Sequence, residues 1–208
     1  MLKLYVVPGT CALASHIALE EAGADYTIER LDFKVNQQNS PEYLEINPKG
    51  RVPSLVTDRG ILTETPAMLA YIAQSFPQAK LAPLGDPFAF AQVQSFNSYL
   101  CSTVHVAHAH KQRGARWATE ESSFADMKRM VPKTVGACFA LIERKMLKGP
   151  WVMGESYSIC DPYLYTLATW LEGDSVDLGG LPKVADHRKR MAERPAVRKA
   201  VAEELTPA

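Results

Sequence analysis

The sequence predicts an α/β domain followed by an all-α domain. Segments with strand character occur only in the first third of the 208-residue chain, where they alternate with helical segments. Helical periodicity fills the remainder. Pro77 and Pro83, which interrupt regular structure, lie between the two parts. We therefore expect a first domain at residues 1–78, a linker at 79–86 and a helical domain at 87–208.

The first domain opens with a strand–helix–strand unit. Residues 2–7 (LKLYVV) are rich in strand-forming side chains, and a Pro-Gly pair ends them. Residues 11–22 have apolar side chains at helical spacing, with Gly23 as a stop signal. Residues 26–31 (YTIERL) alternate as in a strand. This unit predicts a parallel pair of strands with a right-handed crossover.

A hairpin and a helix complete the first domain. Residues 34–50 are polar and irregular, and residues 52–56 and 61–63 are strands joined by the turn Asp58-Arg59-Gly60. Pro66 suits the first position of a helix that runs to residue 75. Strand–helix–strand followed by strand–strand–helix is the order of a thioredoxin-like domain.

The second domain should consist of helices alone. Ser158 and Asp161 form an S-x-x-D capping box, to which we assign a folding role and no catalytic one. Helical periodicity covers residues 87–112, 120–147, 159–171 and 183–204.

Composition excludes several classes of function. The 23 basic and 23 acidic residues cancel, which argues against a nucleic-acid partner. No signal peptide or membrane span is recognisable, so we expect a cytoplasmic protein. The four cysteines form no CxxC pair, as is usual in a reducing compartment.

Cys11 is the first candidate for chemistry. It follows a strand and a turn and begins a helix, where free N–H groups and the helix dipole favour an anion. A thiol in this position can fall from a pKa of about 8.5 to one at which much of it is thiolate at neutral pH. The alternative is a small buried cysteine that only packs.

Two further segments could bind a peptide-like ligand. Val52-Pro53, which opens a strand after a long loop, could be a cis bond that exposes the backbone of Val52 to an added strand. An edge-strand proline is the alternative. Glu64 and Thr65 precede Pro66 at a helix start, which suits an ammonium and a carboxylate group. The alternative is a plain helix cap.

The second domain places Cys101, His105 and His108 on one face of a helix. We expect no metal there, because there is no HExxH motif and no convergent set of carboxylates. His105 suits a polar residue that faces a cleft between the domains.

These features, in this order, resemble the cytosolic glutathione S-transferases, and in particular the bacterial beta class. The resemblance extends over nearly the whole chain and rests on KLYVVPGTCALASHIALEEAG, EINPKGRVPSLV, LTETPAMLAYIAQSFP, SICDPYLYTLATW and RMAERPAV. The segments PGTCALASHIALEE and NPKGRVPSL are its most specific parts.

The resemblance implies a role for each candidate residue. Cys11 would face the glutathione sulfur, and His105 would approach it from the second domain. Val52, ahead of cis-Pro53, would pair with the cysteinyl part of glutathione. Glu64 and Thr65 would hold the γ-glutamyl end.

The resemblance also implies a contact for the glycyl carboxylate and a pocket for the acceptor. Members of the class often carry a basic residue before the NPKG segment, where this chain has Asn36, with Lys34 two residues earlier. The acceptor would lie against the first long helix of the second domain. Tyr99, His108 and Trp117 are candidates for its wall, whereas Trp170 suits core packing better.

We therefore expect a detoxifying homodimeric transferase, with glutathione as co-substrate, that conjugates the glutathione thiolate to small apolar electrophiles. One alternative is a glutathione-dependent disulfide reductase or peroxidase that works through Cys11, since a thiolate can attack or leave in disulfide exchange. The other is a carrier of apolar ligands without catalysis. We expect no nucleic-acid or membrane partner.

Overall fold

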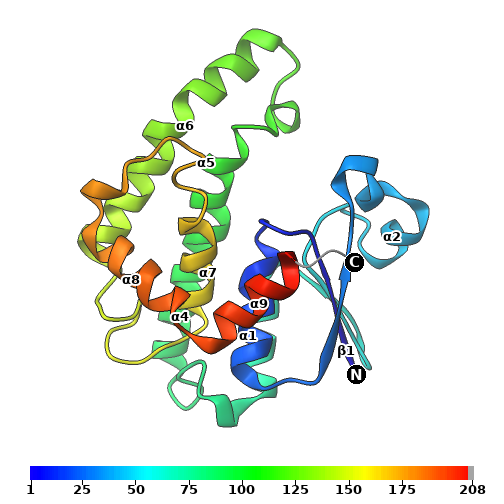
Figure 1. The fold of residues 1–208 in the computed structure, drawn as a ribbon, viewed down its shortest axis with the longest axis vertical. Coiled ribbons are helices and arrows are strands. Elements are labelled where there is room, and N and C mark those ends of the chain that lie inside the picture. The colour runs from blue at the N-terminus through cyan, green and yellow to red at the C-terminus, as the bar shows by residue number, and fades with distance from the viewer. Residues whose placement is uncertain (206–208) are drawn as a thin grey trace.

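The computed structural model describes residues 1–205 and has a sheet-containing part beside a larger helical part. Figure 1 shows the sheet edge-on, with α1 (Ala12–Ala22) between it and the helical part. No helix of the described residues is long and apolar enough to cross a membrane.

The sheet has four strands, in the order β2-β1-β3-β4. Their bounds are Leu2–Val6 for β1, Tyr26–Arg30 for β2, Ser54–Thr57 for β3 and Gly60–Thr63 for β4. β1 pairs in parallel with β2, as predicted, and β3 is antiparallel to both β1 and β4. Fully buried Leu4 and Leu55 face each other across β1 and β3 and fix the register on the core side. With a helix after β1 and another after β4, the thioredoxin-like order is confirmed.

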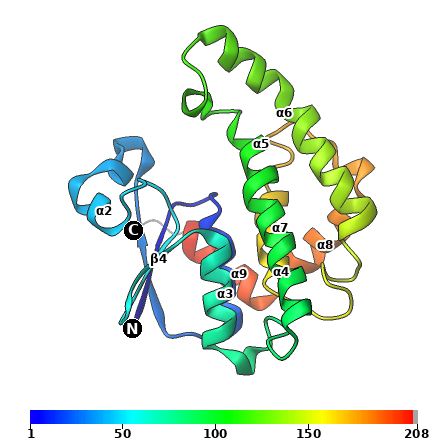
Figure 2. The ribbon, with the colours of Figure 1, turned by 180° about the vertical axis from the view of Figure 1, so that it is seen from behind.

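Two long helices cover one face of the sheet, as Figure 2 shows for α3 (Thr65–Ser75). α1 contacts α3, and on its other side it contacts α7 (Cys160–Ala168) and α9 (Pro195–Leu205). This position explains why even Ser15 and His16 of α1 are completely buried. α2 (Pro41–Ile46) is the short helix of the polar segment and is capped by Ser40.

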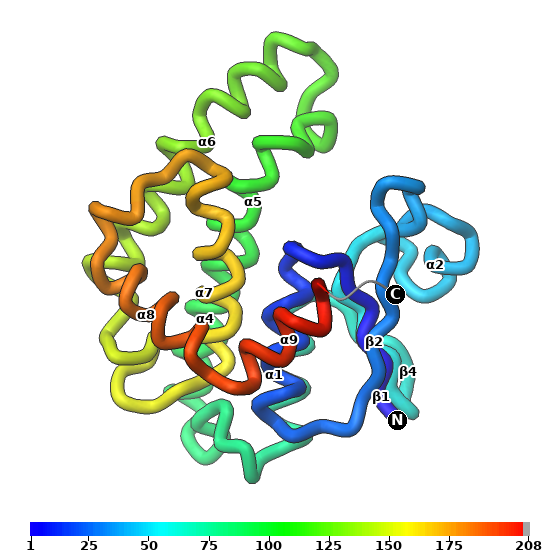
Figure 3. Tube along the Cα trace, viewed as in Figure 1, coloured from blue at the N-terminus to red at the C-terminus, as the bar shows by residue number. Residues whose placement is uncertain are grey.

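The remaining chain is helical, as predicted. α4 (Pro87–Tyr99) continues through one π-helical turn, Leu100–Val104, into α5 (His105–Ala109). The other helices are α6 (Glu121–Leu141), α7, α8 (Pro182–Ala192) and α9. Figure 3 shows the chain returning at its end to lay α9 against α1.

The structure corrects two predicted elements. The run at 183–204 is two helices, because Pro195 has no N–H to donate within a helix and instead begins α9. The strand expected from Val52 begins at Ser54, so Val52 and Pro53 are irregular backbone before the sheet.

The S-x-x-D motif has the folding role expected of it. The buried carboxylate of Asp161 accepts hydrogen bonds from the backbone N–H groups of Ser158 at 2.7 Å and Val152 at 2.8 Å. His187 Nε2 of α8 lies 3.0 Å from the same carboxylate. These contacts join α7, α8 and the preceding loop, because an unpaired buried carboxylate would be costly.

Candidate active site

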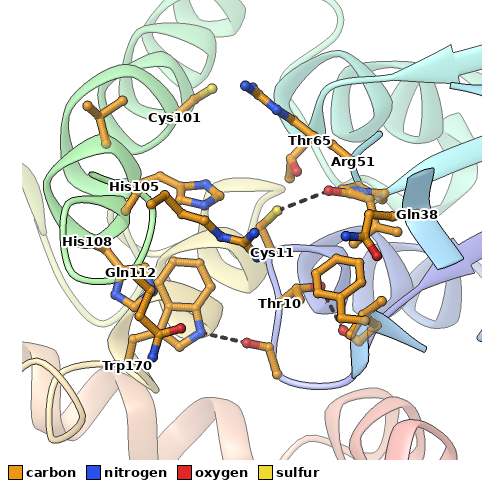
Figure 4. A pocket seen from close by; sticks show the side chains of 18 of the residues that line it. Thr10, Cys11, Gln38, Arg51, Thr65, Cys101, His105, His108, Gln112 and Trp170 are labelled. Atoms are coloured by element: carbon orange, nitrogen blue, oxygen red, sulfur yellow. Dashed lines mark hydrogen bonds between the residues drawn. The ribbon is translucent and has the colours of Figure 1, made fainter. Parts of the chain in front are cut away.

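A cavity of about 580 Å³ lies between the two parts of the molecule. Its size is typical of a small-molecule site. Figure 4 shows side chains entering it from both parts, with Cys11 and Thr65 opposite His105 and His108.

Cys11 immediately precedes α1 and is buried, with 8% of its surface exposed. Its Sγ donates a hydrogen bond to the carbonyl oxygen of Val52 at 3.6 Å. Burial raises the pKa of the Cys11 thiol to about 11, although the side chain of Thr65 acts in the opposite direction. The expectation of a lowered pKa is therefore wrong: desolvation outweighs the helix start, and the unliganded residue is a neutral thiol.

The loop before β3 presents its backbone to the cavity. Val52-Pro53 is a cis bond, as the resemblance implied. Among residues 1–205 the Val52 N–H has no hydrogen-bond partner. Behind it, the carbonyl of Arg51 accepts hydrogen bonds from Tyr43 Oη at 2.6 Å and Asn47 Nδ2 at 2.7 Å. The loop is thus held from the core side while its front stays open for a ligand.

The start of α3 forms the adjoining wall. α3 begins at Thr65, one residue before the start expected at Pro66, so Glu64 occupies the N-cap position. Glu64 has a φ of 72°, an uncommon conformation for a residue with a side chain, which is characteristic of functional sites. Its carboxylate accepts a hydrogen bond from Lys49 Nζ at 2.5 Å, while Thr65 is buried.

Most, but not all, of the residues expected on the helical wall line the cavity. Cys101, His105 and His108 all line the cavity, together with Trp117. Tyr99 does not, and its hydroxyl lies near Cys138 instead. Two helical positions separate Tyr99 from Cys101, so the two side chains leave the helix in roughly opposite directions.

Trp170 belongs to the cavity wall, contrary to the expectation of core packing. Its Nε1 donates a hydrogen bond to the carbonyl of Gly9 at 3.0 Å, across the two parts of the chain. Its ring stacks on His108 with centroids 4.3 Å apart. The Nδ1 of His108 in turn lies 2.6 Å from the buried carboxylate of Asp174. These contacts fix both rings.

His105 is a neutral imidazole at physiological pH. Burial lowers its pKa from 6.5 to about 4, and the neighbouring His108, Arg116 and Arg51 act in the same direction. A neutral ring can donate one hydrogen bond and accept another, so His105 can serve a sulfur or a carbonyl without adding charge.

Lys34 and Asn36 are not among the residues that line the cavity. Lys34 is exposed, and the Oδ1 of Asn36 accepts hydrogen bonds from Gln38 and Asn39 within its own loop. Phe33 and Gln38 are the residues of this loop that reach the cavity. The loop curls through left-handed Asn36, and this turn decides which side chains point inward.

The sequence reasoning missed three arginines. Arg51, Arg113 and Arg116 all line the cavity. The basic run KQRGARW at 111–117 could have indicated Arg113 and Arg116. Their position relative to Arg51, however, depends on how the helical part packs against the first part.

The described residues include one group with the composition of a metal site, and it lies outside the cavity. The ligand atoms of His16, Glu20 and Glu203 are within 4.8 Å of one another. Lys199 Nζ already lies 2.9 Å from the Glu20 carboxylate and supplies positive charge there.

Comparison with known proteins identifies the family. Residues 1–74 match the glutathione S-transferase N-terminal domain. The chain is 32% identical over 206 residues to glutathione S-transferase GstA of Escherichia coli, with 98% of each chain covered. The chain belongs to the glutathione S-transferase family.

Solved structures agree with this assignment. A glutathione transferase homologue from Sulfitobacter, solved with bound glutathione, is 47% identical to this transferase, with a TM-score of 0.96 over 99% of both chains. The bacterial beta class transferase of Sphingomonas chungbukensis is 30% identical, with a TM-score of 0.86 over 98% of both chains.

Proposed function

We propose that this transferase binds glutathione along the Val52 loop and conjugates its thiolate to small electrophiles held against the helical wall. The observation that carries the proposal is the convergence on one cavity of Cys11, the open Val52 backbone and His105. Glutathione-bound relatives with the same fold support it.

The strand geometry gives a direction for the bound tripeptide. Ser54 pairs with Thr63 in the antiparallel hairpin. Glu64 and Thr65, which follow Thr63, therefore lie beside the end of the Val52 loop that leads into β3. An antiparallel added strand whose cysteinyl residue pairs with Val52 would place its γ-glutamyl end at Glu64 and Thr65. Its glycyl carboxylate would then lie beside Arg51, in place of the predicted Lys34 and Asn36 contacts.

Cys11 and His105 would act on the glutathione sulfur as hydrogen-bond donors. A neutral thiol can donate to a thiolate, and so can the N–H of a neutral imidazole. Stabilising the thiolate relative to the thiol lowers the glutathione pKa, at about 1.4 kcal/mol for each pKa unit.

The raised pKa of Cys11 favours conjugation over the disulfide-reductase alternative. Thiol–disulfide exchange needs an attacking thiolate, and a thiol with a pKa of about 11 is almost entirely protonated at neutral pH. The carrier alternative predicts binding without turnover.

The test is isothermal titration of the reduced protein with glutathione. We expect Glu64→Ala to weaken binding by about tenfold, because an ammonium group loses its carboxylate partner. Glu121→Ala, at an exposed position at the start of α6, is the matched control and should bind normally. Equal affinities for Glu64→Ala and wild type would refute the γ-glutamyl assignment. No detectable heat from the folded wild type would favour the carrier.

We further propose that the transferase is a cytoplasmic homodimer that detoxifies electrophiles, on the basis of its family. Sedimentation equilibrium measures the mass directly, and a monomeric mass at micromolar concentration would contradict the dimer.

A further inference from the structure

The charges around the cavity are strongly unbalanced. Among the described residues that line it, Glu64 is the sole carboxylate, and it is paired with Lys49. The cations are Arg51, Lys111, Arg113 and Arg116.

One of these cations is neutralised within the protein. Lys111 Nζ lies 3.4 Å from the buried Asp174 carboxylate, which also contacts His108. In residues 1–205, the ion pairs include none of the three arginines. Arg116 is partly desolvated, and burial together with the charges of Arg51 and Arg113 lowers its pKa. The Arg116 guanidinium is therefore close enough to Arg51 and Arg113 for both to repel it.

Glutathione would neutralise only part of this charge. Its γ-glutamyl end brings an ammonium as well as a carboxylate, and its glycyl carboxylate would lie beside Arg51 in the geometry given above. Arg113 and Arg116 come from the other part of the molecule, on the turn after α5. Both line the cavity, and in the geometry given above no group of glutathione pairs with them.

The turn that carries them is firmly positioned. It is built on the buried Gly114, where a Cβ atom would come within 2.8 Å of the Phe124 ring of α6. The Arg113 guanidinium lies over the Phe33 ring, 5.7 Å from its centroid, and Trp117 packs edge-on against His110. Two cations on one positioned turn, with an aromatic ring under one of them and Trp117 next in the chain, suit a flat acid.

We propose that Arg113 and Arg116 bind a carboxylate carried by the electrophile, so that this transferase selects anionic acceptors over neutral ones. The inference rests on the proposed conjugation function and names the substrate class of the same site. It narrows the earlier expectation of apolar electrophiles: the acceptor has an aromatic or otherwise planar body with an acidic group at its outer end.

The experiment uses a matched pair of acceptors, 4-chloro-3,5-dinitrobenzoate and its methyl ester. Each kcat/KM, measured with the full-length protein and saturating glutathione, is divided by the uncatalysed rate constant of the same acceptor. We expect wild type to prefer the acid by about tenfold or more, since charge-assisted bidentate contacts discriminate strongly. The preference should fall about tenfold in Arg113→Gln/Arg116→Gln and shrink in high salt. Arg129→Gln, on the exposed face of α6, should retain it.

Other outcomes would overturn the inference. A wild type that prefers the ester contradicts it. So does a double variant that loses activity equally on both acceptors through a higher KM for glutathione, because the arginines would then serve glutathione itself.

A binding measurement separates this inference from the proposed function. If the enzyme turned over neither acceptor, that result would count against the proposed conjugation function. The purified conjugates of glutathione with the acid and with the ester can still be titrated calorimetrically. Tighter binding of the acid conjugate, lost in the double variant, supports the acceptor subsite, and equal binding of the two conjugates refutes it.

Discussion

The two halves of the cavity are lined by different kinds of chemical group. The half contributed by the first domain offers backbone groups and short, buried side chains, such as Val52, Cys11 and Thr65. The helical half offers imidazole, indole and guanidinium groups on longer side chains, including half-exposed Trp117. Backbone just before a strand suits a ligand that never changes, whereas protruding side chains can differ between relatives without disturbing the core.

This contrast predicts that the first-domain half is coupled to folding and the helical half to acceptor choice. Substitutions in the first half should change stability and glutathione binding together. Substitutions of Arg113 and Arg116 should change acceptor kinetics at constant stability.

The charges that act on His105 come from both halves, Arg51 from one and Arg116 from the other, and its pH dependence should be the largest effect. Its pKa is lowered from 6.5 to about 4, so the unfolded state binds a proton more readily than the folded state between these values. Stability therefore falls as the pH drops from about 6.5 through 4, by about 3 kcal/mol when complete. Urea unfolding across this range measures the slope. His105→Gln should flatten it, and an unchanged slope would assign it to other groups.

Asn47 tests the coupling of the first half to folding. Its buried amide donates to the Arg51 carbonyl at 2.7 Å and to Ser54 Oγ at 3.2 Å. Asn47→Ala should lower the free energy of unfolding by about 2 kcal/mol and weaken glutathione binding. Urea unfolding and calorimetry measure the two effects. Loss of stability with normal glutathione affinity would uncouple the loop from the site.

Cys11 tests the role of a neutral thiol. Cys11→Ala removes one weak donor and should slow conjugation by about tenfold, whereas Cys11→Ser, which keeps a donor, should retain most of the rate. Initial rates with a panel of electrophiles provide the measurement. A complete loss of turnover in Cys11→Ser would instead indicate covalent chemistry at the sulfur, and with it the disulfide-exchange alternative.

Arg116 tests the independence of the helical half. Arg116→Gln should change the free energy of unfolding by less than about 0.5 kcal/mol, and in the stabilising direction, because it relieves repulsion from Arg51 and Arg113. Thermal unfolding in low salt is the appropriate measurement. Marked destabilisation would show that the side chain has a packing role.

Much of the fold could be read from local patterns. Local signals act over a few residues, and the helices and strands that they predicted are present. Examples are the stop signals, the alternation of strand residues and the capping box at Ser158 and Asp161. The same holds for the shared face of Cys101, His105 and His108. The cis bond at Val52-Pro53, in contrast, was expected only from the family resemblance. The helix break at Pro195 was also encoded locally, by a residue without an N–H, but the prediction ran one helix through it.

Short-range patterns in the amino-acid sequence are enough for the order of elements, the domain types and the family motifs around Cys11 and Pro53. How these residues behave depends on packing between distant segments. Burial between the domains turned the expected thiolate of Cys11 into a neutral thiol. The docking of the helical part brought Arg113 and Arg116 towards Arg51, and the direction of the helix turned Tyr99 away. Desolvation and charge proximity depend on segments far apart in the chain, and no local pattern encodes their distances.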